Sequence, residues 1–329
     1  MSKKRKRKKN SDGEPEELSE MVEFLFKNGL LAWKGEDYEM VEKIFSRILE
    51  YEPQNAAAWY IKGLALAYLK ECEKALSCYE RVLEIDPDNV EAWHNRGVIL
   101  QYSGNYDEAL SSYDKALTID PRHAKAWFGK GTLLEVLEKY AESLFCFDKV
   151  LEIDPDNAEA WYNKGASLEC LGNPEEAVTC LGKAVEINPD NANAWYFKGL
   201  ALGELEKHKE SLTCFDKALE IDPYDAEKWH SKGVTLEYLG KYTEALTCFE
   251  KALTIDPGDP YAWLNKGIVL EDLGKHEEAL FCFDKAVKID PDNAQAWYNK
   301  GIALECLGKH EEAVTCFGKA AKIDPSLEM

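Results

Sequence analysis

Residues 158–191 read AEAWYNKGASLECLGNPEEAVTCLGKAVEINPDN, and this 34-residue pattern recurs along almost the whole chain. A tryptophan, the glycine four residues after it and the proline six residues before it all return at the same step. The tryptophans of the eight units are Trp59, Trp93, Trp127, Trp161, Trp195, Trp229, Trp263 and Trp297. Three residue types in one register over eight units establish an internal repeat, which predicts the fold more strongly than chain length does.

We number each unit so that its tryptophan is position 4. Position 8 is then glycine, position 11 is leucine, position 20 is Ala or Ser, and position 24 is aromatic or leucine. This spacing predicts two helices in each unit. An asparagine such as Asn157 can cap the first helix, a glycine such as Gly172 interrupts the pattern at the turn, and a proline such as Pro155 closes the unit. Neither helix can bury its apolar stripe alone, so each hairpin must stack on its neighbours.

The pattern resembles the tetratricopeptide repeat, whose signature is W-x2-L-G-x2-Y, then A-x3-F, then P. The resemblance covers about residues 20–325. It departs at position 7, where Lys or Arg replaces the family's leucine, and at position 11, where leucine replaces tyrosine. The close agreement among units is similar to that of archaeal and bacterial arrays. The resemblance implies an all-α fold, a right-handed superhelical solenoid of nine tandem helix-turn-helix hairpins.

The same register divides the chain into three parts. Residues 1–18 are charged and contain Ser, Gly and Pro, which favours a disordered head. Residues 19–55 fit a degenerate capping repeat with Leu25 in place of the tryptophan, and residues 56–329 contain eight tandem repeats. Because the sequence stops at Met329, shortly after the last Asp-Pro turn, we expect the last hairpin to expose apolar surface and either to support self-association or to fray.

Charge separates a basic head from an acidic body. The formal net charge is −21, with 61 acidic residues against 40 Lys and Arg, and seven of the basic residues form the run Lys3–Lys9. An acidic body repels nucleic acid and anionic membranes and favours basic partners. For the head several interpretations stay open: contact with nucleic acid through residues 3–9, nuclear import in a eukaryotic host, docking in an acidic groove, or a solubilising tail.

Apolar runs and cysteines indicate the compartment. No apolar run reaches the about 18 residues of a membrane span, and no signal core follows the basic head. We therefore predict no membrane partner and a cytoplasmic location, or a nuclear one in a eukaryotic host. Seven of the ten cysteines recur at position 23, as single thiols rather than as a paired framework, which indicates small buried side chains in a reducing compartment.

The resemblance also implies that positions 2, 5, 6, 9, 12 and 13 of the first helices line a concave groove. Aromatic side chains at positions 5 and 13 would form its floor, amides at position 6 would bond to a ligand's backbone, and glutamates at position 12 would attract Lys or Arg. In the alternative, the rings only contact the neighbouring hairpin and the glutamates form a solvated face. The expected groove residues are Tyr60, Tyr68, His94, Asn95, Tyr102, Phe128, Glu135, Tyr162, Asn163, Glu169, Tyr196, His230, Glu237, Tyr238, Asn265, Glu271, Tyr298, Asn299 and Glu305.

Motifs for catalysis or metal binding are missing from the sequence. It contains no H-E-x-x-H, C-x-x-C, phosphate loop or G-x-S-x-G, and the segment Asp154–Asn157 lacks the glycine and the final glutamate of a calcium loop. His208, His276 and His310 occupy position 17, where other units have tyrosine, and this favours packing over metal ligation. We therefore predict no enzyme activity, no metal and no cofactor.

These patterns favour a protein-interaction scaffold or adaptor that binds a peptide or protein segment in its groove. The partner segment would contain basic and apolar residues. The alternative is a regulatory or targeting subunit of a larger enzyme or of a nucleic-acid-associated complex, which would use the basic head. Binding that fell steeply with salt and vanished on deletion of the head would favour this alternative.

Overall fold

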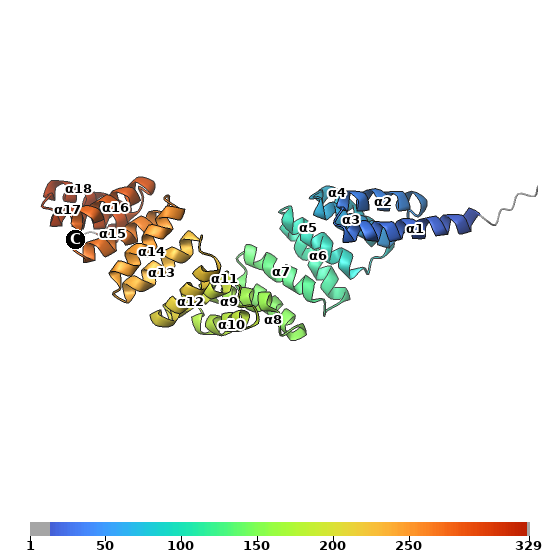
Figure 1. Cartoon of the computed structure of the whole chain (residues 1–329), viewed down its shortest axis with the longest axis horizontal. Helices are drawn as coiled ribbons and strands as arrows, with labels where there is room; N and C mark the ends of the chain where they lie inside the picture. Colours follow the sequence, from blue (N-terminus) through green and yellow to red (C-terminus); the bar gives the residue numbers. More distant parts are fainter. Residues whose placement is uncertain (1–13, 328–329) are drawn as a thin grey trace, which may run out of the picture. The chain divides into compact units, whose positions relative to one another are not determined.

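The structure is a computed structural model that describes residues 14–327. This range contains eighteen α-helices, one short 3-10 helix and no strand, so the prediction of an all-α fold is confirmed (Figure 1). The basic run Lys3–Lys9 lies outside the described residues, and helix α1 begins at Glu14, inside the range 1–18 that the sequence assigns to a head. No helix within residues 14–327 combines the length and apolar character that a membrane crossing requires.

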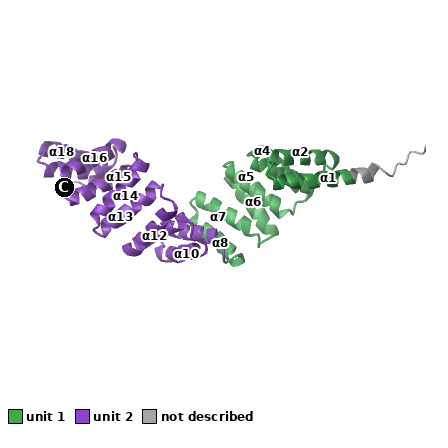
Figure 2. Ribbon diagram, viewed as in Figure 1, with its two compact units in different colours: residues 1–155 green, residues 156–329 purple. Residues whose placement is uncertain are grey.

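The chain divides into two compact units, residues 1–155 and residues 156–329 (Figure 2). Each consists of consecutive helix pairs joined by short turns. The helices of the first unit are α1 (Glu14–Lys34), α2 (Tyr38–Tyr51), α3 (Ala56–Tyr68), α4 (Cys72–Ile85), α5 (Val90–Tyr102), α6 (Tyr106–Ile119), α7 (Ala124–Val136) and α8 (Tyr140–Ile153). Those of the second are α9 (Ala158–Cys170), α10 (Pro174–Ile187), α11 (Ala192–Glu204), α12 (His208–Ile221), α13 (Ala226–Tyr238), α14 (Tyr242–Ile255), α15 (Pro260–Asp272), α16 (His276–Ile289), α17 (Ala294–Cys306), α18 (His310–Ile323) and the 3-10 helix η1 (Pro325–Leu327).

The recurring tryptophan and proline share a step because they are hydrogen-bonded to each other. The indole Nε1 of Trp59 donates to the carbonyl oxygen of Pro53 at 2.9 Å, six residues earlier. Beside this bond, Asn55 caps α3 by accepting the backbone N–H of Ala58 at 2.9 Å. Together the two bonds set where the connecting segment ends and where the first helix begins. The same indole bond is made by Trp93, Trp127, Trp195, Trp229, Trp263 and Trp297.

The glycine at position 8 lets the two helices of a hairpin approach closely. A Cβ atom placed on Gly267 would lie 2.5 Å from the ring of Phe283, the fully buried aromatic residue at position 24. The cysteine at position 23 packs beside this ring. Cys282 is 2% exposed and free, and burial raises the pKa of its thiol to about 11. The seven position-23 cysteines are all buried, as expected from their single place in the repeat.

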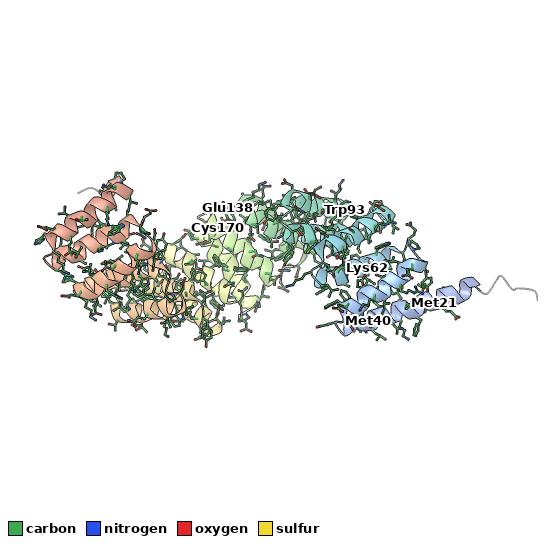
Figure 3. The ribbon with its side chains drawn as sticks, turned by 90° about the horizontal axis from the view of Figure 1, so that it is seen from above. Met21, Met40, Lys62, Trp93, Glu138 and Cys170 are labelled. Carbon is green, nitrogen blue, oxygen red and sulfur yellow. The ribbon has the colours of Figure 1, made fainter. Side chains whose placement is uncertain are left out.

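The turn inside each hairpin needs one residue in the left-handed region. Position 15 supplies it, and in five units that residue is a glycine, as at Gly240 with φ +69°. In the other four units position 15 is a larger residue with the same positive φ. These are Glu36, Lys70, Glu138 and Glu206, of which Glu138 is labelled in Figure 3. An L side chain is strained there, so these turns are held by the hairpin around them.

Basic side chains at position 7 cover the outer face of the tryptophans. The amine of Lys130 lies 5.9 Å from the ring centre of Trp127 and 2.6 Å from the carboxylate of Asp114 in the preceding hairpin. Lys62, labelled in Figure 3, instead contacts Glu42, one helical turn earlier in the preceding second helix, at 3.5 Å. The apolar stem of each side chain thus covers a ring while its charge stays near solvent.

Candidate functional site

The aromatic residues at position 5 are mostly half-buried and pack inside their own hairpin. The ring centre of Tyr60 lies 6.1 Å from that of Tyr79, and the ring centre of His94 lies 6.0 Å from that of Tyr113. Tyr196 is more deeply covered, with 6% exposed. Position 5 therefore presents only part of each ring to the surface where a groove is expected. Phe128, Tyr162, His230 and Tyr298 are likewise half-buried.

Amides at position 6 connect consecutive hairpins. Nδ2 of Asn95 donates to the hydroxyl of Tyr60 at 2.9 Å, and Nδ2 of Asn265 lies 2.9 Å from Nε2 of His230. In both pairs the partner is the position-5 residue of the preceding hairpin. These two amides, expected to bond to a ligand's backbone, therefore already have partners within the chain. The other two expected amides, Asn163 and Asn299, are half-buried.

Position 13, together with Glu305 at position 12, presents the more accessible part of the expected groove. The position-13 side chains of Tyr68, Tyr102 and Tyr238 are 60%, 73% and 72% exposed. Glu305 is exposed as well. Large exposed rings at one register position form a surface with which a partner can make contact. The remaining position-12 glutamates, Glu135, Glu169, Glu237 and Glu271, are half-buried.

Side chains at positions 12 and 17 of one hairpin meet the side chain at position 13 of the next hairpin, and we call these three positions a junction. At the first junction Tyr38 stacks on Tyr68, with ring centres 4.5 Å apart, and Trp33 meets Tyr68 edge-on at 5.6 Å. At another, His208 stacks on Tyr238. The repeat pattern alone does not place position 17 in the groove, because that position lies on the second helix. The signal that was available is that position 17 is Tyr or His in most units.

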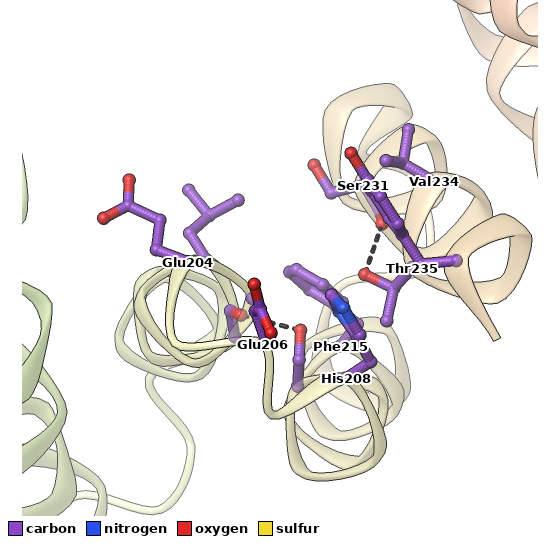
Figure 4. A pocket seen from close by; sticks show the side chains of 12 residues that line it. Glu204, Glu206, His208, Phe215, Ser231, Val234 and Thr235 are labelled. Atoms are coloured by element: carbon purple, nitrogen blue, oxygen red, sulfur yellow. Dashed lines mark hydrogen bonds between the residues drawn. The ribbon is translucent and has the colours of Figure 1, made fainter.

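Two hollows lie at junctions where position 12 is a small residue. A hollow of about 520 Å³ adjoins Gly203, and one of about 370 Å³ adjoins Ala67. In most other units position 12 carries Gln or Glu, whose side chain extends toward this space. Figure 4 shows the larger hollow, between α11, α12 and α13. Its lining includes the apolar side chains Leu200, Phe215 and Val234, the stacked pair His208 and Tyr238, and the acidic residues Glu204 and Glu206.

Carboxylates repel one another electrostatically at two junctions within residues 156–329. Burial, and next the charge of Glu204, raise the pKa of Glu169. In the same way, burial and the charge of Asp272 raise the pKa of Glu237. In each pair a position-12 carboxylate of one hairpin interacts electrostatically with a position-13 carboxylate of the next hairpin. Negative charge therefore gathers in partly covered positions, where salt screens it less than on an open surface.

Comparisons with known proteins agree with the repeat register. Seven consecutive segments match the tetratricopeptide repeat family, at residues 90–123, 124–157, 158–191, 192–225, 226–259, 260–293 and 294–327. Residues 63–104 match a second description of the same repeat. A search of curated proteins finds no match.

Solved structures of repeat proteins are similar to this chain. YrrB, described as a TPR protein with an unusual peptide-binding site, is 30% identical with a TM-score of 0.51; the match covers 56% of this chain and 95% of YrrB. A tetratricopeptide repeat protein from Parabacteroides merdae is 20% identical with a TM-score of 0.55, and the match covers 79% of this chain and 99% of that one. PilF from Pseudomonas aeruginosa is 19% identical with a TM-score of 0.56, over 63% of this chain and 94% of PilF. The last two similarities concern the fold alone.

Proposed function

The chain belongs to the tetratricopeptide repeat family, and we propose that it is a scaffold without enzymatic activity that binds a basic segment of a partner protein. The segment would lie along the first helices of residues 156–329. Its Lys or Arg side chains would enter the junctions, and its apolar side chains would contact exposed rings such as Tyr238. The observation that carries this proposal is the pairing of carboxylates at Glu169 with Glu204 and at Glu237 with Asp272.

A cation placed between two such carboxylates would relieve their repulsion. Burial, and next the charge of Asp272, raise the pKa of Glu237, so its charged form needs compensation from a positive charge. A Lys or Arg of a ligand would supply it, and a hydrogen bond between charged groups contributes about 1.5–3 kcal/mol. Recognition at several junctions along one chain would add up through avidity, so each single contact can be weak.

The hollow beside Gly203 fits the same class of side chain. Its lining includes the apolar side chains of Phe215 and Val234 and, on the side of Phe215, the carboxylate of Glu206 (Figure 4). The methylene stem of a Lys or Arg would pack on the apolar side chains while its charged end met the Glu206 carboxylate. The similarity to YrrB, whose description names a peptide-binding site, supports a peptide as the ligand.

Selection from a library of random displayed peptides against the full chain tests the proposal. We expect the enriched peptides to be rich in Lys and Arg with interspersed apolar residues, and their affinity to fall as salt rises. The double variant Glu237→Gln/Asp272→Asn should weaken binding of these peptides by about tenfold or more, which corresponds to about 1.4 kcal/mol.

The matched control is Glu186→Gln/Glu210→Gln, which removes two carboxylates from the second helices α10 and α12. Both residues are exposed, and the change in net charge is the same. Equal weakening by the two double variants would mean that general attraction to an acidic protein explains the affinity. Specific recognition by the groove carboxylates would then be excluded. Enrichment of acidic peptides would contradict the proposal directly.

A further inference from the structure

One junction brings together three side chains that are ligands for transition metals. Glu271 is the residue before the last of α15, His276 begins α16, and Cys306 ends α17. One donor atom from each lies within 4.8 Å of the other two. Nδ1 of His276 is 2.7 Å from Oε1 of Glu271. Three consecutive helices of two hairpins therefore converge on a space the size of one ion.

The carboxylate of Glu271 is incompletely satisfied at this junction. The Glu271 side chain is 18% exposed, and its buried Oε2 atom makes no hydrogen bond of good geometry among the described residues, although the Cys306 thiol is close enough for Glu271 to raise the pKa of that thiol. A buried carboxylate oxygen that accepts no hydrogen bond is unfavourable. Cys306 remains exposed, so an ion has a route from solvent to the junction.

The donor set selects the kind of ion. A thiolate together with an imidazole and a carboxylate suits zinc, whereas calcium and magnesium prefer oxygen donors only. Zinc bonds of about 2.0–2.3 Å place tetrahedral donors roughly 3.5 Å apart, so the three atoms need only small rotamer adjustments to close around an ion. We propose that Glu271, His276 and Cys306 bind one zinc ion, with the fourth coordination position left open.

Other junctions show how specific this combination is. The junction before it has Glu237, Tyr242 and Asp272, which lack both nitrogen and sulfur donors. In the last hairpin, His310 and Glu305 repeat the histidine–glutamate pair at 2.7 Å, but no third donor joins them in the described part of the chain. The zinc ion would link hairpin 260–293 to hairpin 294–327. Position 17, which the repeat pattern assigns to packing, would then provide a metal ligand in this one unit.

Titration of the untagged, reduced full chain with zinc and with cobalt tests the site. We expect one bound zinc per chain by calorimetry. Bound cobalt should give a thiolate charge-transfer band and the ligand-field bands of tetrahedral geometry. Zinc should also slow amide hydrogen exchange in α15, α16 and α17, because it restrains three helices at once.

Substitutions identify the ligands. Cys306→Ser should abolish the cobalt charge-transfer band, and His276→Ala should weaken zinc binding by at least about tenfold. The controls are Cys170→Ser, another exposed position-13 cysteine, and His310→Ala, which breaks the similar pair; both should leave binding unchanged. Circular dichroism checks that each variant remains folded. Absence of stoichiometric zinc binding, or binding that Cys306→Ser does not alter, would overturn the proposal.

Discussion

The imidazole of His208 lies parallel to the ring of Tyr238 in the next hairpin, with ring centres 5.0 Å apart and an angle of 2° between the planes. His208 begins a second helix and Tyr238 ends the first helix of the following hairpin. Tyr38 and Tyr68 repeat this relationship at 4.5 Å and 9°. Stacking at this register therefore joins neighbouring hairpins and also forms one wall of a hollow open to ligands.

Removing one ring of the stack should loosen the junction. We expect Tyr238→Ala to lower the free energy of unfolding by about 1 kcal/mol, because an aromatic pair contributes about 0.5–1.5 kcal/mol beyond its buried area. Hydrogen exchange should accelerate in α12 and α13 more than elsewhere. Tyr224→Ala is the control, because Tyr224 is 84% exposed and belongs to no junction. Equal effects of the two variants would mean that the stack does not stabilise the junction.

Glycine at position 8 is required by the aromatic ring opposite it. Gly267→Ala would place a Cβ atom 2.5 Å from Phe283, so we expect a loss of about 1–3 kcal/mol of unfolding free energy from overpacking. Gly318→Ala provides a matched helical control, because a Cβ there meets nothing within 4 Å. That change should stabilise α18 by up to about 1 kcal/mol through helix propensity. Urea unfolding measures both, and a neutral result for Gly267→Ala would show that the ring can move aside.

The positive φ at position 15 predicts opposite effects for two substitutions. Glu138→Gly should stabilise the protein by about 0.5–1 kcal/mol, since it relieves a side chain at φ 57°. Gly240→Ala should destabilise it by about 1 kcal/mol, although its Cβ would have open space around it. Thermal unfolding of the two variants is the measurement. Effects of the same sign would mean that backbone strain does not control stability at this turn.

The repeat register was sufficient to predict the helix pairs and the buried cysteines. Trp, Gly and Pro recur at a fixed step because each has one packing or hydrogen-bonding role, as the bond from Trp59 to Pro53 illustrates. The side chains facing a partner were harder to predict. Helical periodicity puts Asn95 on an open face, but its amide bonds to Tyr60 of the preceding hairpin. Contacts between consecutive hairpins join residues such as these, 35 positions apart in the sequence. The periodicity of a single helix carries no information about such contacts.

Position 12 is a second case in which the repeat pattern does not identify the ligand-binding positions. Its glutamates are visible in the sequence, but the two units that lack a long side chain there, with Ala67 and Gly203, are the ones whose junctions contain the hollows. The clustering of Glu271 with Cys306 also requires coordinates, because these residues are separated by a complete hairpin. Sequence analysis thus identifies the repeat, and the differences between units determine where ligands can bind.

His94 should make the stability of the compact unit of residues 1–155 sensitive to mild acid. The pKa of His94 is lowered from 6.5 to about 4, mainly by burial and to a smaller extent by the neighbouring His123 and Lys125, while Glu91 opposes the shift. Its Nδ1 atom is buried and has no hydrogen-bond partner among the described residues. Above pH 6.5 the ring is neutral in the folded and unfolded states, so it adds no pH dependence there. Below that pH only the unfolded chain takes up the proton, and stability falls until the folded ring is protonated near pH 4.

Each pKa unit of difference corresponds to about 1.4 kcal/mol, so the loss should approach about 3 kcal/mol across this window. NMR titration of the His94 ring should give a midpoint near 4. His94→Phe, which copies Phe128 at the same position of the next unit, should remove this part of the acid sensitivity. Comparing the pH dependence of urea unfolding in the two proteins separates His94 from the many carboxylates, which titrate equally in both. Identical pH profiles, or a His94 midpoint at its ordinary value, would show that the ring is solvated in the folded protein.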